Sequence, residues 1–140
     1  MAQEEIVELE FCSARVAIVA LRGEHDISTR TLIVPALAAA ARCSHVIVDL
    51  TACTFADSSV ISTLLDSAVR QASGGGALEL IVPSGTATVW RTLELMGVVG
   101  LLRVHETRRA ALASIELPRG LLLRAVTEPA PAESQLPRTA

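Results

Sequence analysis

Runs of apolar residues divide the first part of the chain into strands. Residues 6–12 alternate loosely and residues 15–21 more strictly, so both are predicted to be strands. The short connection between them favours an antiparallel hairpin. Residues 46–50 form an apolar run broken only by Asp49, which is typical of a strand covered on both faces. We expect the strand from about residue 45 to 50 to lie centrally in a sheet, with helices on at least one face.

Apolar residues at helical spacing follow the strands, with turn residues between the elements. Strand–helix–strand units imply parallel pairing with right-handed crossovers. The predicted order is ββαβαβαβα: an α/β fold with a mixed, mostly parallel sheet of about five strands and about four helices. Beyond the segments above, the predicted helices are 28–42, 58–73, 86–96 and 106–115, the predicted strands are 77–82 and 100–104, and 22–26 and 51–57 are predicted loops.

Each predicted helix has an apolar stripe for burial. Pro35 interrupts the first stripe, since a proline inside a helix costs ~3 kcal/mol or more. We favour a distorted helix there, and the alternative is a helix that begins at Pro35. The stripes expected to be buried are Leu32, Ile33, Ala36, Leu37 and Ala40 in the first helix, Val60, Ile61, Leu64, Leu65, Ala68 and Val69 in the second, and Val89, Trp90, Leu93 and Leu95 in the third.

Composition indicates one domain followed by a tail. The chain has 140 residues, of which 51% are hydrophobic, enough for one domain with a packed core. We assign residues 1–117 to this domain. Residues 118–140 contain four of the six prolines and are predicted to be mobile. Residues 121–126 are too apolar for a solvated tail, and we expect them to dock on the domain or on a second copy, which leaves a homodimer open.

Charge and motif content argue against several function classes. The net charge of −3 and the lack of a long basic run give no support to nucleic-acid binding. No apolar run approaches the roughly 20 residues of a membrane-spanning helix, and the acidic N-terminus does not resemble a signal peptide. Three cysteines without CxxC spacing indicate a reduced, cytoplasmic protein.

Enzymatic chemistry is the least favoured class. Residues 74–76 are three glycines, but they precede a strand and no Lys-Ser/Thr follows, so they are not a phosphate-binding loop. The three histidines lack metal-ligand spacing and are expected in solvated or satisfied core positions. No nucleophile, base and orienting group occur together. We therefore expect no catalytic residues, no metal and no cofactor.

The candidate functional site is the start of the helix after the central strand. Asp57, Ser58 and Ser59 precede its apolar stripe, and such side chains accept hydrogen bonds from the first helical turn. A serine hydroxyl would then lie beside a carboxylate at the positive end of the helix dipole. An ordinary helix cap is the simpler interpretation of these residues taken by themselves. Likewise, Asp66 and Arg70 at i, i+4 are most simply a solvated helix pair.

Three motifs together resemble the STAS domain, and most closely the anti-sigma factor antagonists. They are Gly23-Glu24-His25-Asp26, Val48-Asp49-Leu50-Thr51 and Thr54-Phe55-Ala56-Asp57-Ser58-Ser59, and the similarity covers roughly residues 4–116. In that family an anti-sigma factor, itself a protein serine kinase, phosphorylates the first serine of the Asp-Ser-Ser motif. The resemblance thus implies phosphorylation at Ser58, with Ser59 as second choice. It also implies an anti-sigma kinase and a serine phosphatase as partners.

The chain departs from the family pattern at two positions. His25 stands where the family has leucine, and Val60 where it has glycine. Valine lacks the small size and freedom of glycine, so we expect it to restrict the approach of a partner backbone. The alternative function is a STAS subunit that docks without phosphorylation in a lipid-transport or stress-sensing complex. The residues predicted to contact a partner are Asp26, Asp57, Ser59, Ser62, Thr63 and Asp66.

Overall fold

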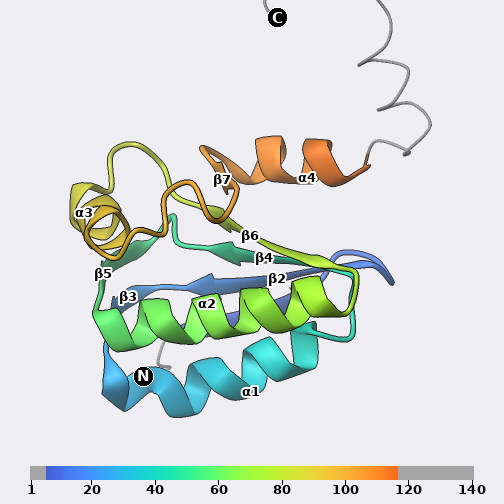
Figure 1. Ribbon diagram of the computed structural model, residues 1–140, viewed down its shortest axis with the longest axis horizontal. Helices are drawn as coiled ribbons and strands as arrows, with labels where there is room; N and C mark the ends of the chain where they lie inside the picture. Colours follow the sequence, from blue (N-terminus) through green and yellow to red (C-terminus); the bar gives the residue numbers. More distant parts are fainter. Residues whose placement is uncertain (1–5, 117–140) are drawn as a thin grey trace, which may run out of the picture.

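The structure is a computed structural model that describes residues 6–116 (Figure 1). The predicted mobile tail and the docking segment at 121–126 lie outside these residues. The elements follow the predicted order, with two short strands and one 3₁₀ turn added. They are β1 (Val7–Phe11), β2 (Val16–Leu21), β3 (Gly23–His25), η1 (Ile27–Thr29), α1 (Arg30–Ala40), β4 (His45–Asp49), β5 (Cys53–Ala56), α2 (Ser58–Ser73), β6 (Ala77–Ile81), α3 (Ala87–Leu95), β7 (Val104–His105) and α4 (Arg108–Glu116).

The main sheet has five strands in the order β1-β2-β4-β6-β7. Strand β1 pairs antiparallel with β2, and the other pairs are parallel. The predicted α/β architecture with a mixed, mostly parallel sheet is confirmed. The prediction that residues 45–50 form a central strand is also confirmed, because β4 lies between β2 and β6 and is buried from Val46 onward.

Helices cover both faces of the sheet (Figure 1). Helices α1 and α2 lie side by side on one face, where alternate residues such as Val19, Val48 and Leu80 are fully buried in the main core. Helix α4 covers the opposite face and packs on a smaller cluster. Strand β4 buries the side chains that point to each of its two faces, so its near-continuous apolar pattern follows from this layering.

Helix α1 runs through Pro35, so the alternative of a helix that begins at this proline is wrong. Pro35 lies on the exposed side, while Ile33, Leu37 and Ala40 are buried against the sheet. Because the tertiary contacts of this face stabilise the helix on both sides of the proline, the loss of one backbone hydrogen bond does not end it.

Several sequence predictions are corrected by the tertiary arrangement. The last strand is Val104–His105 rather than 100–104. The predicted loops 22–26 and 51–57 contain β3 and β5, which pair with each other in a small parallel sheet. Three side chains predicted to be buried are exposed: Leu32 at 50%, Val69 at 64% and Leu95 at 78%. Helical spacing alone did not indicate that these side chains lie at the margins of their stripes, where no other element covers them.

Candidate functional site

The N-terminus of α2 is capped by Asp57, as the sequence predicts. Its Oδ1 accepts hydrogen bonds from the backbone N–H of Val60 at 3.0 Å and from the Ser59 hydroxyl at 2.7 Å. Ser58 is the first helical residue and is exposed. Among residues 6–116, the Ser58 hydroxyl makes no hydrogen bond. The two serines thus differ: Ser59 supports the cap, whereas Ser58 presents its hydroxyl to solvent.

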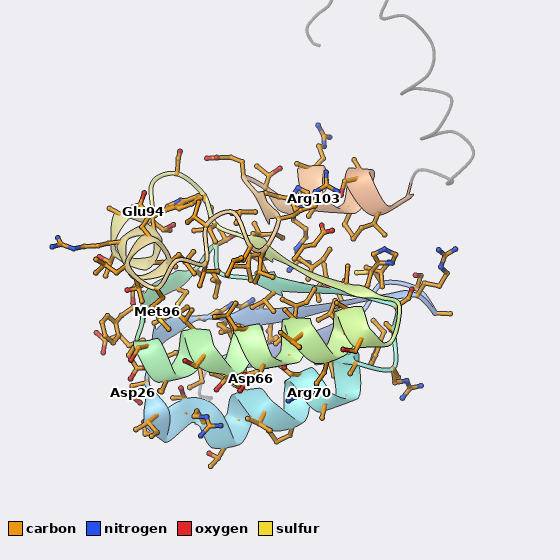
Figure 2. All side chains as sticks on the ribbon, in the orientation of Figure 1. Asp26, Asp66, Arg70, Glu94, Met96 and Arg103 are labelled. Atoms are coloured by element: carbon orange, nitrogen blue, oxygen red, sulfur yellow. The ribbon has the colours of Figure 1, made fainter. Side chains whose placement is uncertain are left out.

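The small sheet brings the Gly-Glu-His-Asp segment to this helix start. His25 pairs with Ala56 in the β3–β5 register, and the Asp57 N–H donates to the His25 carbonyl at 3.2 Å. Asp26 and Asp57 therefore each follow directly on a paired residue, at the same end of two parallel strands. Figure 2 shows Asp26 at the end of the molecule where α2 begins. The sequence motifs identified these two aspartates as candidate site residues, and the β3–β5 pairing brings them together.

His25 is a satisfied core residue. Its side chain is fully buried, with Nδ1 3.1 Å from the Thr29 hydroxyl and Nε2 2.9 Å from the Arg22 carbonyl oxygen. One ring nitrogen of a neutral imidazole donates while the other accepts, so this pair of contacts is met by a single tautomer. His25 therefore joins β3 to η1 through buried hydrogen bonds. It occupies a core position, as the leucine of the family pattern would.

Asp26 caps the 3₁₀ turn that follows. Its Oδ1 accepts from the Ser28 N–H and hydroxyl, and the Asp26 N–H donates to the Thr29 hydroxyl. The hydrogen bonds from Ser28 lower the pKa of this exposed carboxyl below its ordinary value. Asp26 is thus a structural cap and also a fixed negative charge at neutral pH.

The side of α2 that faces α1 contains a contact the sequence did not reveal. The Thr63 hydroxyl donates to the Ser59 carbonyl at 2.9 Å and accepts from Arg30 Nε at 3.0 Å. Thr63 is buried, and its hydroxyl is used within the fold. The structure therefore gives Thr63 a packing role, and its predicted contact with a partner is untested. Arg30 was missed because its partner is 33 residues away and no local pattern connects them.

The outward face of α2 carries the other predicted contact residues. Ser62 and Asp66 are exposed there, and Asp66 lies near Arg70 in Figure 2. The predicted Asp66–Arg70 helix pair is not formed, since the Arg70 guanidinium instead reaches Ser67 at 3.5 Å. Asp66 is accordingly left as a solvated carboxylate on the same face as Ser62.

Val60 does not obstruct this surface. Its side chain is fully buried and points into the main core. The expectation that this valine restricts a partner backbone is therefore wrong: the helix turns residue 60 inward while Ser58 stays exposed. The surface around Ser58 consists of the capping loop and the outward turn of α2.

Within residues 6–116, no group of three or more His, Cys, Asp or Glu side chains is arranged to hold a metal ion. Likewise, no helix in that range is long and apolar enough to cross a membrane. What the described site offers is an exposed hydroxyl at a helix N-terminus, next in sequence to the capping carboxylate of Asp57, with the capping carboxylate of Asp26 at the same end of the β3–β5 pair.

Comparison with known proteins identifies the family of the domain. The family model described as "Mlab, STAS domain" matches residues 13–104, more than half of the chain. The chain belongs to the STAS domain family. This match spans the sheet from the β1–β2 turn to β7 and includes every residue of the candidate site. The sequence matches none of the curated proteins with which it was compared.

Solved structures show the same STAS fold at low sequence identity. An anti-sigma factor antagonist from Mycobacterium paratuberculosis superposes with a TM-score of 0.70 at 18% identity, covering 79% of this chain and 93% of the other. The Bacillus cell fate determinant SpoIIAA in its phosphorylated form gives 0.63 at 19%, covering 79% and 99%. A Thermotoga maritima protein described as a putative anti-sigma factor antagonist gives 0.67 at 17%, covering 79% and 95%. These structures establish the fold.

Proposed function

We propose that this STAS domain is an anti-sigma factor antagonist of the cytoplasm whose binding is switched off by phosphorylation of Ser58. The observation that carries the proposal is the contrast between the two serines of the motif. Ser58 is exposed at the first position of α2 with its hydroxyl unengaged by residues 6–116, whereas the Ser59 hydroxyl donates to the capping carboxylate of Asp57. A kinase can reach Ser58 without disturbing the cap.

The local structure tolerates a phosphate at this point. A phosphoserine adds about −1.5 to −2 charge, and the N-terminus of a helix favours an anion. Binding to a partner is affected in the opposite direction. Asp57 directly precedes Ser58, and Asp26 follows β3 at the end of the β3–β5 pair where α2 begins, so the phosphate deepens a negative surface. An interface that covers this surface loses affinity through charge repulsion and desolvation, without any refolding of the domain.

The proposed partner is an anti-sigma factor with serine kinase activity, and a serine phosphatase restores binding. The partner surface comprises the capping loop with Asp26 and Asp57 and the outward side of α2 with Ser62 and Asp66. Ser59 belongs to this surface and is partly buried. Capture of the kinase by this surface would release the sigma factor that the kinase holds.

The test compares three variants with the wild type against the cognate kinase and ATP. Ser58→Ala should bind the kinase but incorporate no phosphate, and Ser59→Ala should still be phosphorylated. Ser58→Asp should bind more weakly by about 30-fold or more, since like charges in an interface cost several kcal/mol. Site assignment by mass spectrometry and a binding titration provide the two readouts.

Ser13→Asp is the matched control for added charge. Ser13 is exposed in the β1–β2 turn, at the end of the molecule opposite the start of α2 (Figure 1). This variant should bind the kinase as the wild type does. Phosphate on Ser59 would move the site by one residue, and equal affinity of wild type and Ser58→Asp would refute the switch.

A second candidate is a docking subunit that works without phosphorylation, in a lipid-transport or stress-sensing complex. The observation in its favour is that the matching family model is described as a STAS domain and not as an antagonist. The same surface would then bind its partner constitutively. Unchanged binding by Ser58→Asp together with no phosphate incorporation into the wild type would favour this candidate.

A further inference from the structure

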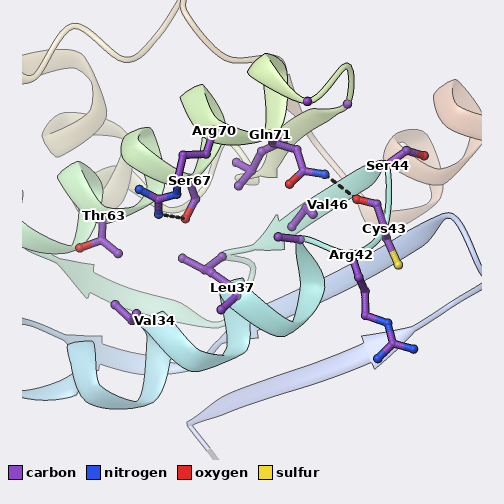
Figure 3. A pocket seen from close by; sticks show the side chains of 15 residues that line it. Val34, Leu37, Arg42, Cys43, Ser44, Val46, Thr63, Ser67, Arg70 and Gln71 are labelled. Atoms are coloured by element: carbon purple, nitrogen blue, oxygen red, sulfur yellow. Dashed lines mark hydrogen bonds between the residues drawn. The ribbon is translucent and has the colours of Figure 1, made fainter.

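A groove lies between α1 and the C-terminal half of α2, on the helical face of the sheet (Figure 3). Its volume is about 550 Å³, within the range of roughly 300–1,000 Å³ that small-molecule sites occupy. The groove adjoins the proposed switch surface only through Thr63, and its residues take no part in the function proposed above. It therefore requires its own explanation.

The floor and one wall of the groove are apolar. Leu37, Val46 and Leu78 are buried residues of the main core that line it from below. Helix α1 contributes Val34, which is 42% exposed, and Ala38, and its C-cap residue is Ala41, which also lines the groove. Alanines at these positions leave open space beside α2 that larger side chains would fill. The groove thus offers an apolar surface wide enough for an aliphatic chain or a ring.

The opposite wall is polar and carries a positive charge. Arg70 lies over the groove in Figure 3, and its guanidinium makes one weak hydrogen bond, to the Ser67 hydroxyl at 3.5 Å. Thr63 and Ser67 lie on the same wall. The second lining arginine, Arg42, is turned away, because its guanidinium lies 5.1 Å from the centre of the Phe11 ring. Arg70 is therefore the cation available to a ligand.

The charge of the groove is opposite to that of the chain. The protein has a net charge of −3, yet none of the residues that line the groove is Asp or Glu. The guanidinium reaches back along α2 toward Ser67, away from the carbonyl groups at the helix C-terminus that would repel an anion. Arg70 thus supplies a positive charge to a groove whose lining carries no carboxylate.

The far end of the groove is held in place by close contacts. Gln71 donates from its side-chain amide to the Cys43 carbonyl, which joins α2 to the loop after α1. Gly76 packs against the same loop so closely that a Cβ there would lie 2.2 Å from the Ser44 carbonyl oxygen. The groove is consequently a preformed feature of the fold, not a gap between loosely packed helices.

We propose that this groove binds a small amphipathic anion, with a single carboxylate on an apolar body. The carboxylate accepts hydrogen bonds from Arg70 and the hydroxyl of Ser67, and the apolar body lies on Leu37 and Leu78 beside Ala38. A site of this kind requires both features, since the exposed cation provides orientation and the apolar floor provides most of the contact area.

The probe for this proposal is octanoate, titrated into the ¹⁵N-labelled full chain and followed by amide chemical shifts. We expect saturable shifts at Ala38, Thr63, Ser67 and Leu78. Octylammonium has the same apolar body with the opposite charge and should bind at least about tenfold more weakly, because Arg70 repels it. Octanol, which lacks the charge, should fall between the two.

Two variants and one control locate the site. Arg70→Gln should weaken octanoate about tenfold while its effect on octanol is small. Ala38→Leu fills the groove from an exposed helical position and should abolish binding of all three probes. Arg109→Gln removes an exposed arginine from α4, on the opposite face of the sheet, and should leave octanoate affinity unchanged.

The proposal is overturned by any of three results. These are shifts that map away from the groove, equal affinity for octanoate and octylammonium, or an Arg70→Gln variant that binds octanoate as the wild type does. A groove that binds a hydrophobic segment of a protein partner instead of a small anion would give the second result. None of these measurements depends on Ser58 or on a kinase, so the groove and the switch can fail separately.

Discussion

Replacement of the α2 cap should separate the structural role of Asp57 from its charge. Asp57→Ala removes the acceptor for the Val60 N–H and for the Ser59 hydroxyl. Loss of an N-cap costs about 1 kcal/mol, and the partly buried hydroxyl left without its partner costs about 1 kcal/mol more. The charge interaction with the helix dipole contributes a further 0.3–1 kcal/mol, roughly. The free energy of unfolding should therefore fall by about 2–3 kcal/mol.

Asp57→Asn distinguishes these contributions. Asparagine is as good an N-cap as aspartate and keeps the side-chain oxygen, so only the dipole contribution of about 0.5 kcal/mol is lost. Asp66→Ala is the matched control, because it removes an exposed aspartate from the same helix but away from the cap. It should change the free energy of unfolding by less than about 0.5 kcal/mol.

Urea unfolding followed by far-UV circular dichroism measures all three variants with the linear extrapolation method. Equal destabilisation by Asp57→Asn and Asp57→Ala would refute the assignment of the cap as the main contribution. An Asp57→Ala variant as stable as the control would refute the role of both hydrogen bonds. The Asp57→Asn protein also offers the kinase an intact helix start with one negative charge fewer, so it tests how far Asp57 contributes to the negative surface.

Two further predictions concern packing and thiol chemistry. Gly76→Ala should lower the free energy of unfolding by about 1–3 kcal/mol in the same assay, because the added Cβ meets a backbone carbonyl at 2.2 Å. In the control Gly85→Ala the added Cβ meets nothing within 4 Å, so stability should be unchanged or rise by up to about 1 kcal/mol. A Gly85→Ala variant less stable than Gly76→Ala would contradict the close approach at Gly76. Iodoacetamide should modify exposed Cys12 in the native protein well before Cys53, because burial raises the pKa of the Cys53 thiol and reduces its reactive thiolate. Mass spectrometry of tryptic peptides measures the labelling, with a urea-unfolded sample as reference. Early labelling of Cys53 in the native protein would show that this reasoning is wrong.

Local patterns in the sequence determined the main sheet, the α/β class and the start of α2. The apolar run of β4 can be recognised because burial on both faces makes the consecutive residues Val46, Ile47 and Val48 apolar. The cap at Asp57 can be recognised because the free N–H groups of a first helical turn require an acceptor, which a side chain nearby in sequence supplies. Both features depend on residues close in sequence, so both could be predicted without coordinates.

Tertiary structure alone decided how the site is assembled. Strands β3 and β5 are too short to show a period, and only their mutual pairing orders them and places Asp26 beside the start of α2. The Arg30–Thr63 hydrogen bond joins residues on two helices, and the groove exists because small residues of α1 face Arg70 across a gap. Side-chain partners and cavities arise from how elements pack, which the periodicity of any single element does not contain. The sequence by itself therefore named Ser58, Asp57 and Asp26, and the packing determined that Ser58 faces solvent while Val60 and Thr63 do not.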